Sequence, residues 1–411
     1  MEKVAFIHYA YPPNIGGVET LLHEYAKELV DRNFSVSVIV GSGNEIDNRI
    51  DLTIEPSFRS LLQHDPSLYA EIVEHGHITD SFYNLASTIY KKLEKLLIDK
   101  DVIIIHNMIT LYHNMPFTYA FKQYVQKYGS KKKFIVWVHD HTYIGFDKIR
   151  TNEFHLHPLI HQLLTEKLPN VLYIAISDYV KKQLMKVIPL EKNDIVVIPN
   201  GIYISNFLNM SPEIWQLITA KKIFAYFPIA LSPVNILERK NIEYSLHVVA
   251  ELKKTYPMII YVITGSGSTH RKSKLYQDYI DHLVHELGLQ NNVFMLGKNV
   301  QRYLTMNEIR SIYMLSDFVL YFSKGENFGL PILEAGITKT PIFTSNLEVF
   351  KEIGGDDIVR IDIKSHSPEV AKNIIVKSIT NSRVMRLAHK TRSTYNLSEI
   401  IETKLLPLIQ S

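Results

Sequence analysis

Two glutamates follow a short apolar segment and could do chemistry together. Residues 317–322 read as a buried strand, and Glu326 and Glu334 come next with seven residues between them. Pro331 suits the first turn of a helix, so we expect Glu326 on a loop and Glu334 on the helix. Paired carboxylates suggest the acid and nucleophile of a glycosidase, whereas acids at a helix start also occur because they suit the helix dipole. The pair alone leaves both interpretations open.

Basic and small residues occupy similar places after other strands. Arg239 and Lys240 precede an expected helix at 242–254, where a cation could meet a diphosphate or simply form a solvated helix end. Gly16 and Gly17 follow the first expected strand, where a diglycine lets backbone approach a ligand or forms a tight turn. Lys240 and Glu326 would face each other if their loops belong to neighbouring βα units of one sheet.

Two further apolar runs end in polar side chains. Asn107 follows a strand expected at 101–106, which ends in a histidine, and His139 and Asp140 follow a run that starts at residue 134. One such histidine is more often a capped strand end than a catalyst. Two on successive parallel strands indicate the same edge of a cleft.

Length and composition limit the class of protein. With 411 residues the chain is too long for one ordinary core, and its βα pattern predicts two α/β halves, 1–202 and 222–386, with a linker at 203–221. A net charge of +3 makes no electrostatic case for nucleic acid, and the absence of cysteine excludes disulfides and thiolate catalysis. No charged leader or long apolar run is present, so we expect a cytoplasmic protein without a transmembrane segment. The few lysines of an amphipathic stretch at 87–97 favour a solvated helix over peripheral membrane contact.

Several familiar motifs are missing. No P-loop occurs, and the glycines at 265 and 267 lack the third glycine of a dinucleotide fingerprint. The pair His139 and His141 has no third ligand at a standard metal spacing, and no Ser-His-Asp nucleophile elbow is present. A metal site and a nicotinamide cofactor are therefore not expected.

Taken together, the motifs resemble those of the family 4 retaining glycosyltransferases. Residues 323–335 resemble the Glu-x7-Glu signature of that family, and 11–13 with 16–19 resemble its N-terminal donor loop. Residues 137–140 resemble its active-site histidine strand. The segments 176–184, 198–202, 239–241 and 262–267 follow in the order of the family. The match spans nearly the whole chain, and the joint order is more specific than any single motif.

The resemblance implies an α/β fold of the GT-B type. Two Rossmann-like domains with parallel sheets would face each other across a deep cleft, with the acceptor on the first domain and the nucleotide sugar on the second. A C-terminal helix at 387–411 would cross back to the first domain. The implied activity is transfer of a hexosyl unit from a UDP- or GDP-linked sugar, UDP-glucose or GDP-mannose, to a hydroxyl acceptor, without a required cofactor.

The resemblance also assigns roles to residues of this chain. Lys240 would neutralise the diphosphate, Glu326 would lie beside the donor sugar, and Glu334 would hold the ribose hydroxyls. His139 would contact the sugar near the reacting face. The further donor-binding residues are Gly16, Gly17, Arg239, Asn327, Phe328, Gly329 and Leu330, and those on the acceptor side are Glu19, Asn107 and Asp140.

One position departs from the family pattern. The family usually has an arginine about five residues before its phosphate-binding lysine, and here that residue is Asn235. Either Arg239 replaces it, or this chain binds the phosphates more weakly. No Asp-x-Asp metal motif is evident, which fits a metal-independent front-face mechanism with retention. The alternatives are a sugar-nucleotide epimerase, a phosphorylase and a catalytically weak protein that binds sugar nucleotides.

Overall fold

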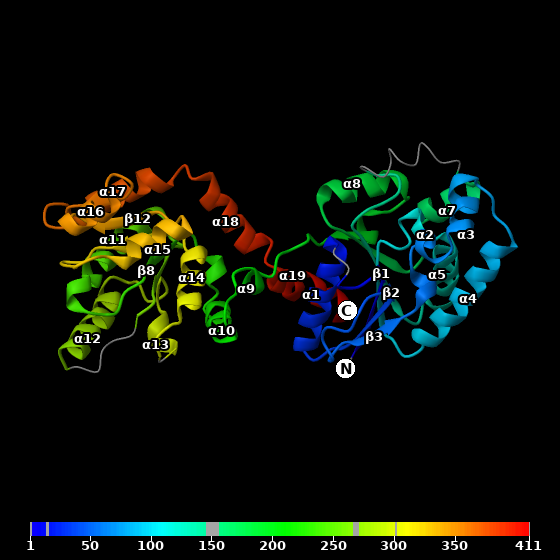
Figure 1. Ribbon diagram of the computed structural model, residues 1–411, viewed down its shortest axis with the longest axis horizontal. Helices are drawn as coiled ribbons and strands as arrows, with labels where there is room; N and C mark the ends of the chain where they lie inside the picture. The colour runs from blue at the N-terminus through cyan, green and yellow to red at the C-terminus, as the bar shows by residue number, and fades with distance from the viewer. Residues whose placement is uncertain (1, 14–15, 145–155, 266–270, 301, 411) are drawn as a thin grey trace. The chain divides into compact units, whose positions relative to one another are not determined.

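The computed structural model describes residues 2–13, 16–144, 156–265, 271–300 and 302–410. Its contacts divide the chain into two compact units (Figure 1). Unit 1 comprises Met1–Gly201 and Leu397–Ser411, and unit 2 comprises Ile202–Asn396.

Unit 1 is built on a parallel sheet of seven described strands. In spatial order these are β3 (Asp51–Ile54), β2 (Ser35–Ser42), β1 (Lys3–Ala10), β4 (Val102–His106), β5 (Lys133–Val138), β6 (Val171–Ala175) and β7 (Ile195–Val197). All five residues of β4 are buried, as expected for a parallel strand covered on both faces. The described helices are α1 (Gly17–Asp31), α2 (Leu61–His64), α3 (Pro66–Tyr69), α4 (Asp80–Leu96), α5 (Met115–Tyr128), α7 (Pro158–Thr165), α8 (Asp178–Val187), α19 (Leu397–Ile400) and α20 (Leu406–Gln410).

Unit 2 repeats the design with six described strands. Their order is β10 (Val293–Met295), β9 (Ile260–Ile263), β8 (Ile229–Ser232), β11 (Phe318–Tyr321), β12 (Ile342–Ser345) and β13 (Val359–Ile361). The described helices are α9 (Ile204–Phe207), α10 (Pro212–Ala220), α11 (Ile242–Thr255), α12 (Arg271–Glu286), α13 (Leu296–Val300), α14 (Met306–Leu315), α15 (Leu330–Thr338), α16 (Glu348–Gly354), α17 (Pro368–Ile379) and α18 (Arg383–Thr394). Figure 1 shows helices packed around each sheet.

Both sheets have the doubly wound strand order. The first strand of each unit lies inside its sheet, and the order reverses between β1 and β4 in unit 1 and between β8 and β11 in unit 2. All strand pairs at these positions are parallel. In such sheets the crevice outside the carboxyl ends of the strands at the reversal point is the usual place for a ligand.

The first strand of unit 2 begins only at Ile229, because Ile223–Ala225 form a 3-10 turn and Pro228 has no N–H for the ladder. Two expectations about elements need correction. Residues 203–221, expected as a linker, form α9 and α10, whose Ile204, Ile214 and Ile218 join the core of unit 2.

The C-terminal segment is not one helix. The helix expected at 387–411 is interrupted after α18, where Ile202 N donates to Tyr395 O at 2.8 Å and Ile202 pairs with Asn396. This pairing takes the backbone out of the helix without any glycine. The return to unit 1 therefore begins at Leu397, not at residue 387.

Candidate functional site

A basic loop and an acidic loop meet at the reversal point of the unit 2 sheet. The loop after β8 ends in a 3-10 turn at Glu238–Lys240, and the loop after β11 carries Glu326. Lys324 N donates to Arg239 O at 2.8 Å and ties the two loops together. Neighbouring strands therefore deliver opposite charges to one crevice, as the sequence predicted for Lys240 and Glu326.

Glu326 is held by two cations and a hydroxyl group. Arg239 Nη1 lies 2.8 Å from Oε2, Lys240 Nζ donates to Oε1, and Ser323 Oγ donates to Oε1 at 2.9 Å. Burial by itself would raise the pKa of Glu326, but the hydrogen bonds from Lys240 and Ser323 outweigh it and the pKa is lowered. The Lys240 side chain is 12% exposed, whereas that of Arg239 is 55% exposed. Lys240 is therefore the better-placed cation for an anionic ligand.

Glu334 is positioned by the first turns of α15 and by a tyrosine from α14. Gly329 precedes the helix with a φ of 123°, which glycine adopts without strain, and a Cβ there would lie 2.9 Å from Phe350 Cε1. The hydroxyl of Tyr313 donates to Glu334 Oε2 at 2.7 Å. Burial, and then the neighbouring Glu334 carboxylate, raise the pKa of Tyr313, which keeps it a donor. One carboxylate oxygen is thus fixed and the other is available.

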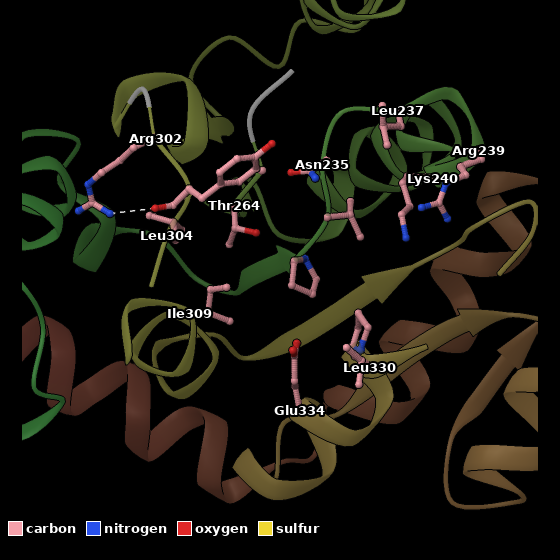
Figure 2. A pocket seen from close by; sticks show the side chains of 15 residues that line it. Asn235, Leu237, Arg239, Lys240, Thr264, Arg302, Leu304, Ile309, Leu330 and Glu334 are labelled. Atoms are coloured by element: carbon pink, nitrogen blue, oxygen red, sulfur yellow. Dashed lines mark hydrogen bonds between the residues drawn. The ribbon is translucent and has the colours of Figure 1, made fainter. Parts of the chain in front are cut away.

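Glu334 and Lys240 line the same cavity of about 350 Å³. Figure 2 shows Glu334 pointing into it from α15, with Lys240 and Asn235 on the opposite wall. Thr264 and Gly265, at the end of β9, also line it. A Cβ on Gly265 would lie 2.3 Å from Asn235 Cα, so only glycine lets these two loops approach so closely.

A second cavity of about 460 Å³ lies beside Glu326. It is lined by residues 325–331 and Tyr321, and it shares Arg239, Lys240, Leu330 and Pro331 with the first cavity. The donor-side residues predicted in unit 2 all line one or both cavities: Arg239, Lys240, Glu326, Asn327, Phe328, Gly329, Leu330 and Glu334. Ser266 and Gly267, which belong to the 262–267 motif, lie outside the described residues.

The predicted polar residues of unit 1 gather at the ends of β4 and β5. Asn107 has a φ of 56°, which turns its side chain to the neighbouring strand end. Its Oδ1 accepts from His139 N at 2.8 Å and from Asp140 N at 2.9 Å, and its Nδ2 donates to Asp140 Oδ2 at 3.1 Å. Asn107 therefore acts as a bracket that sets the backbone of His139 and Asp140.

Three histidines lie next to this bracket. His106 Nδ1 and His139 Nε2 are 3.0 Å apart, and His8 Nδ1 donates to His106 O at 3.0 Å. Burial, reinforced by His8, lowers the pKa of His139 to about 3, and burial lowers the pKa of His106 well below its ordinary value. Both rings are thus neutral at pH 7. His8 was not predicted, because a histidine inside an apolar strand carries no local signal.

Glu19 lies at the start of α1 and faces His8. Its Oε1 is 3.6 Å from His8 Nε2, and the interaction with this histidine is the main cause of the lowered pKa of Glu19. Gly16 packs under this carboxylate, since a Cβ on Gly16 would lie 1.9 Å from Glu19 Oε2. A Cβ on Gly17 would meet nothing within 4 Å. The loop therefore needs a glycine at 16 for packing, whereas 17 is open.

Sequence comparison connects both units with enzymes that transfer sugars. The family described as glycosyltransferase family 4 matches residues 15–206, and the family described as glycosyl transferases group 1 matches residues 213–394. Together the two matches span both units. The chain belongs to the family 4 glycosyltransferases. It is a hexosyltransferase, and its paired doubly wound sheets make a GT-B fold.

Curated relatives of this glycosyltransferase include characterised and uncharacterised members. Mannosylglucosylglycerate synthase of Petrotoga mobilis is 25% identical over 336 residues, which cover 74% of this chain and 71% of the relative. An uncharacterized glycosyltransferase of Methanocaldococcus jannaschii is 24% identical over 89% of this chain and 86% of its own length. Among solved structures, HepE of Anabaena aligns over the whole of both chains at 15% identity with a TM-score of 0.36, too low for that likeness to bear on this chain.

Two features are absent from the residues that the structure describes. No helix in them has the length and apolar character needed to cross a bilayer. No group of three or more histidine, aspartate or glutamate side chains in them is arranged to hold a metal ion.

Proposed function

We propose that this glycosyltransferase moves a hexosyl unit from a nucleoside-diphosphate sugar to a hydroxyl acceptor with retention of configuration. The observation that carries the proposal is the pair of adjoining cavities in unit 2. One has Glu334 and Lys240 on its walls, the other has Glu326 and Lys240. A nucleotide in the first and a sugar in the second would place a diphosphate where the two cavities share Lys240.

Lys240 supplies the charge that this chemistry requires. Breaking the bond between sugar and diphosphate leaves negative charge on the departing phosphate, and a fixed cation in a partly buried place stabilises that charge. Lys240 Nζ has three hydrogens, so it can keep its bond to Glu326 and still donate to a phosphate oxygen. Arg239 adds a second cation at the rim, in a chain that has Asn235 where the family usually has an arginine.

The two carboxylates take different roles in the proposal. Glu334 accepts hydrogen bonds from the two ribose hydroxyls, and Tyr313 keeps one of its oxygens in place. Glu326 accepts from a hydroxyl of the donor sugar, while the backbone N–H groups of residues 327–330 donate to the sugar and the phosphates. Since neither acid is a nucleophile here, no covalent glycosyl-enzyme intermediate is required.

Unit 1 supplies the remaining groups. His139 contacts the transferred sugar near its reacting face, and Gly16 and Gly17 offer backbone to the diphosphate. Glu19, Asn107 and Asp140 are the proposed acceptor-side residues. Retention then follows a front-face route, in which the departing phosphate takes the proton of the acceptor hydroxyl, and no metal ion takes part.

The proposal is tested with a panel of nucleotide sugars as donors, and two of them come first. The name of the Petrotoga mobilis relative indicates a product that contains both mannose and glucose, so GDP-mannose and UDP-glucose are tested first. The acceptor is proposed to be a small polar molecule with free hydroxyl groups, such as a sugar acid glycoside.

Release of nucleoside diphosphate from the panel, with and without acceptor, tests the proposal. A transferase releases the nucleotide faster when acceptor is added, and the anomeric configuration of the product by NMR reports retention. An epimerase would convert the sugar without a second substrate, and a phosphorylase would need inorganic phosphate. Stabilisation by UDP or GDP without any turnover would indicate a binding protein and contradict the proposal.

The site assignment has its own variants. Glu326→Ala and Glu334→Gln should each lower the rate of transfer, whereas Glu251→Gln should not, because Glu251 belongs to α11 and lines neither cavity. Full transfer by Glu326→Ala would contradict the placement of the donor sugar. Unchanged activity in the presence of a chelator is the expected result for a metal-independent enzyme.

A further inference from the structure

A buried histidine in unit 1 touches the histidine that we place at the donor sugar. His106 ends β4 with none of its surface exposed, and its Nδ1 lies 3.0 Å from Nε2 of His139. The two residues come from neighbouring strands whose register sets His106 beside Trp137, two positions before His139. His106 does not line either cavity of unit 2, and the function proposed above gives it no role.

The ring of His106 is held in one orientation. It stacks on Trp137 with centroids 5.1 Å apart and an interplanar angle of 17°, and it lies 5.8 Å from the ring of Phe6. Its carbonyl accepts from His8 Nδ1. These ring contacts hold the imidazole in the plane that turns Nδ1 toward His139.

The positions of the ring hydrogens decide which histidine donates in the bond between His106 Nδ1 and His139 Nε2. Burial keeps both rings neutral, so each carries one N–H and one bare nitrogen. If His139 Nε2 donated, His106 would carry its hydrogen on Nε2, which is buried and has no hydrogen-bond partner among the residues that the structure describes. If His106 Nδ1 donates, the same buried Nε2 is only an unpaired acceptor. Orphaned buried N–H groups are rarer than unpaired acceptors, so the second arrangement is favoured.

We propose that His106 is a positioning residue that locks His139 in the tautomer with its hydrogen on Nδ1. His139 then presents an N–H to a ligand and cannot accept a proton or hydrogen bond at that nitrogen. His8, Glu19 and Asn107 are the other polar groups near the ring in the described part of the chain. Glu19 contacts His8 Nε2 and Asn107 accepts from the backbone N of His139, so neither contact uses Nε2 of His139.

The lock defines what His139 does in catalysis, and this part rests on the proposed function. An imidazole with Nδ1–H donates to a hydroxyl oxygen of the donor sugar and does not serve as the base for the acceptor. The acceptor proton must therefore go elsewhere, which agrees with the departing phosphate of the front-face route. A histidine base at this place would require the opposite tautomer.

The tautomer can be measured without any substrate. The full-length protein is labelled with ring-15N histidine, and two-bond 1H–15N correlation spectra are recorded at pH 7.5, with the His139 signals assigned by their loss in His139→Gln. The expected spectrum shows Nδ1 of His139 as the protonated nitrogen and Nε2 as the bare one. A protonated Nε2 would overturn the proposal, even if glycosyl transfer is established. Failure to find any donor would contradict the proposed function and leave this measurement valid.

Two variants of His106 separate its hydrogen bond from its packing. His106→Asn keeps an N–H donor near the place of Nδ1, so His139 should keep its tautomer and kcat should stay within about twofold. His106→Phe keeps a flat ring against Trp137 but has no donor, so His139 should populate both tautomers and kcat should fall about tenfold with little change in the donor KM.

The control is His141→Phe. His141 is buried two residues beyond His139, and its Nε2 donates to Leu164 O at 3.0 Å. This variant should lower thermal stability and leave the tautomer of His139 unchanged. The proposal fails if His106→Phe leaves the tautomer unchanged, or if His141→Phe shifts it equally. If His106→Phe does not fold, the wild-type and His106→Asn spectra still decide.

Discussion

Replacing Lys240 by methionine should weaken nucleoside diphosphate binding far more than the same replacement of Arg239. Methionine keeps much of the apolar stem of the side chain and removes the charge. The Lys240 side chain is 12% exposed, and its ammonium lies 5.3 Å from the centre of the Tyr321 ring. A hydrogen bond to a charged group in such a place contributes ~1.5–3 kcal/mol. Its loss should raise the Kd about 10- to 150-fold.

The same replacement of Arg239 should cost much less. Its side chain is 55% exposed, and ion pairs at exposed places contribute ~0–1 kcal/mol, which is at most about fivefold in Kd. Loss of Lys240 has a further effect in the same direction. Glu326 loses one of the two cations that contact it and keeps Arg239, so its negative charge opposes the diphosphate more strongly.

Isothermal titration calorimetry with UDP and with GDP measures both effects at one fixed ionic strength, because salt screens the exposed arginine more than the partly buried lysine. Lys254→Met is the matched control. It removes the same charge from an exposed lysine of α11 that pairs with Glu251. Its Kd should equal that of the wild type. A Kd for Lys240→Met within twofold of the wild type, or a larger loss for Arg239→Met, would refute this placement of the diphosphate.

Three further outcomes follow from the contacts. Tyr313→Phe removes the hydroxyl that holds Glu334, and the loss of this hydrogen bond, ~1 kcal/mol, should raise the Kd for UDP or GDP about fivefold. Tyr261→Phe loses a hydrogen bond to Ser232 in the same sheet and should leave the Kd unchanged. Equal Kd values for the two variants would contradict a role for Tyr313. Arg392→Leu removes the guanidinium that contacts both oxygens of the buried Asp317 carboxylate, and it should lower the free energy of unfolding in urea by ~3–5 kcal/mol. Arg49→Leu, at an exposed arginine, should lower it by less than ~1 kcal/mol. Similar losses in the two variants would argue against a stabilising role for the pair of Arg392 and Asp317. Hydrogen bonds from Arg302 lower the pKa of Glu308 to about 2, against about 4.3 for an unfolded chain, so its stabilisation is complete above pH ~4.3 and is lost as the pH falls toward 2. The stability gap between wild type and Glu308→Gln should therefore shrink over that range, and a gap independent of pH would contradict it.

The residues around the two cavities of unit 2 were predictable because their signals are local. Glu326, Gly329 and Glu334 belong to a single β-loop-α unit, so strand and helix periodicity place them correctly at one sheet edge. Lys240 belongs to the neighbouring unit, and the rule for parallel sheets brings the two loops together. The same reasoning predicted the polar ends of β4 and β5, since contiguous apolar runs in an α/β chain are buried parallel strands.

The features that the sequence did not predict depend on contacts between distant segments. Nothing near Glu334 in the sequence indicates Tyr313, which comes from another helix, and nothing near Glu19 indicates its partner His8. The break before Leu397 has no glycine or proline signal, because it is caused by pairing with Ile202.

By itself the sequence determined two α/β units, the loops that carry charge and the family of enzymes. Those features follow from the periodicity of hydrophobic residues and from the residue types at strand ends, which are properties of short segments. Only the tertiary structure decided that Lys240 is partly buried while Arg239 is exposed, and that His106 contacts His139 at the edge of the sheet. Burial and hydrogen-bond direction depend on which strands become neighbours and in which register, and no short segment contains that information.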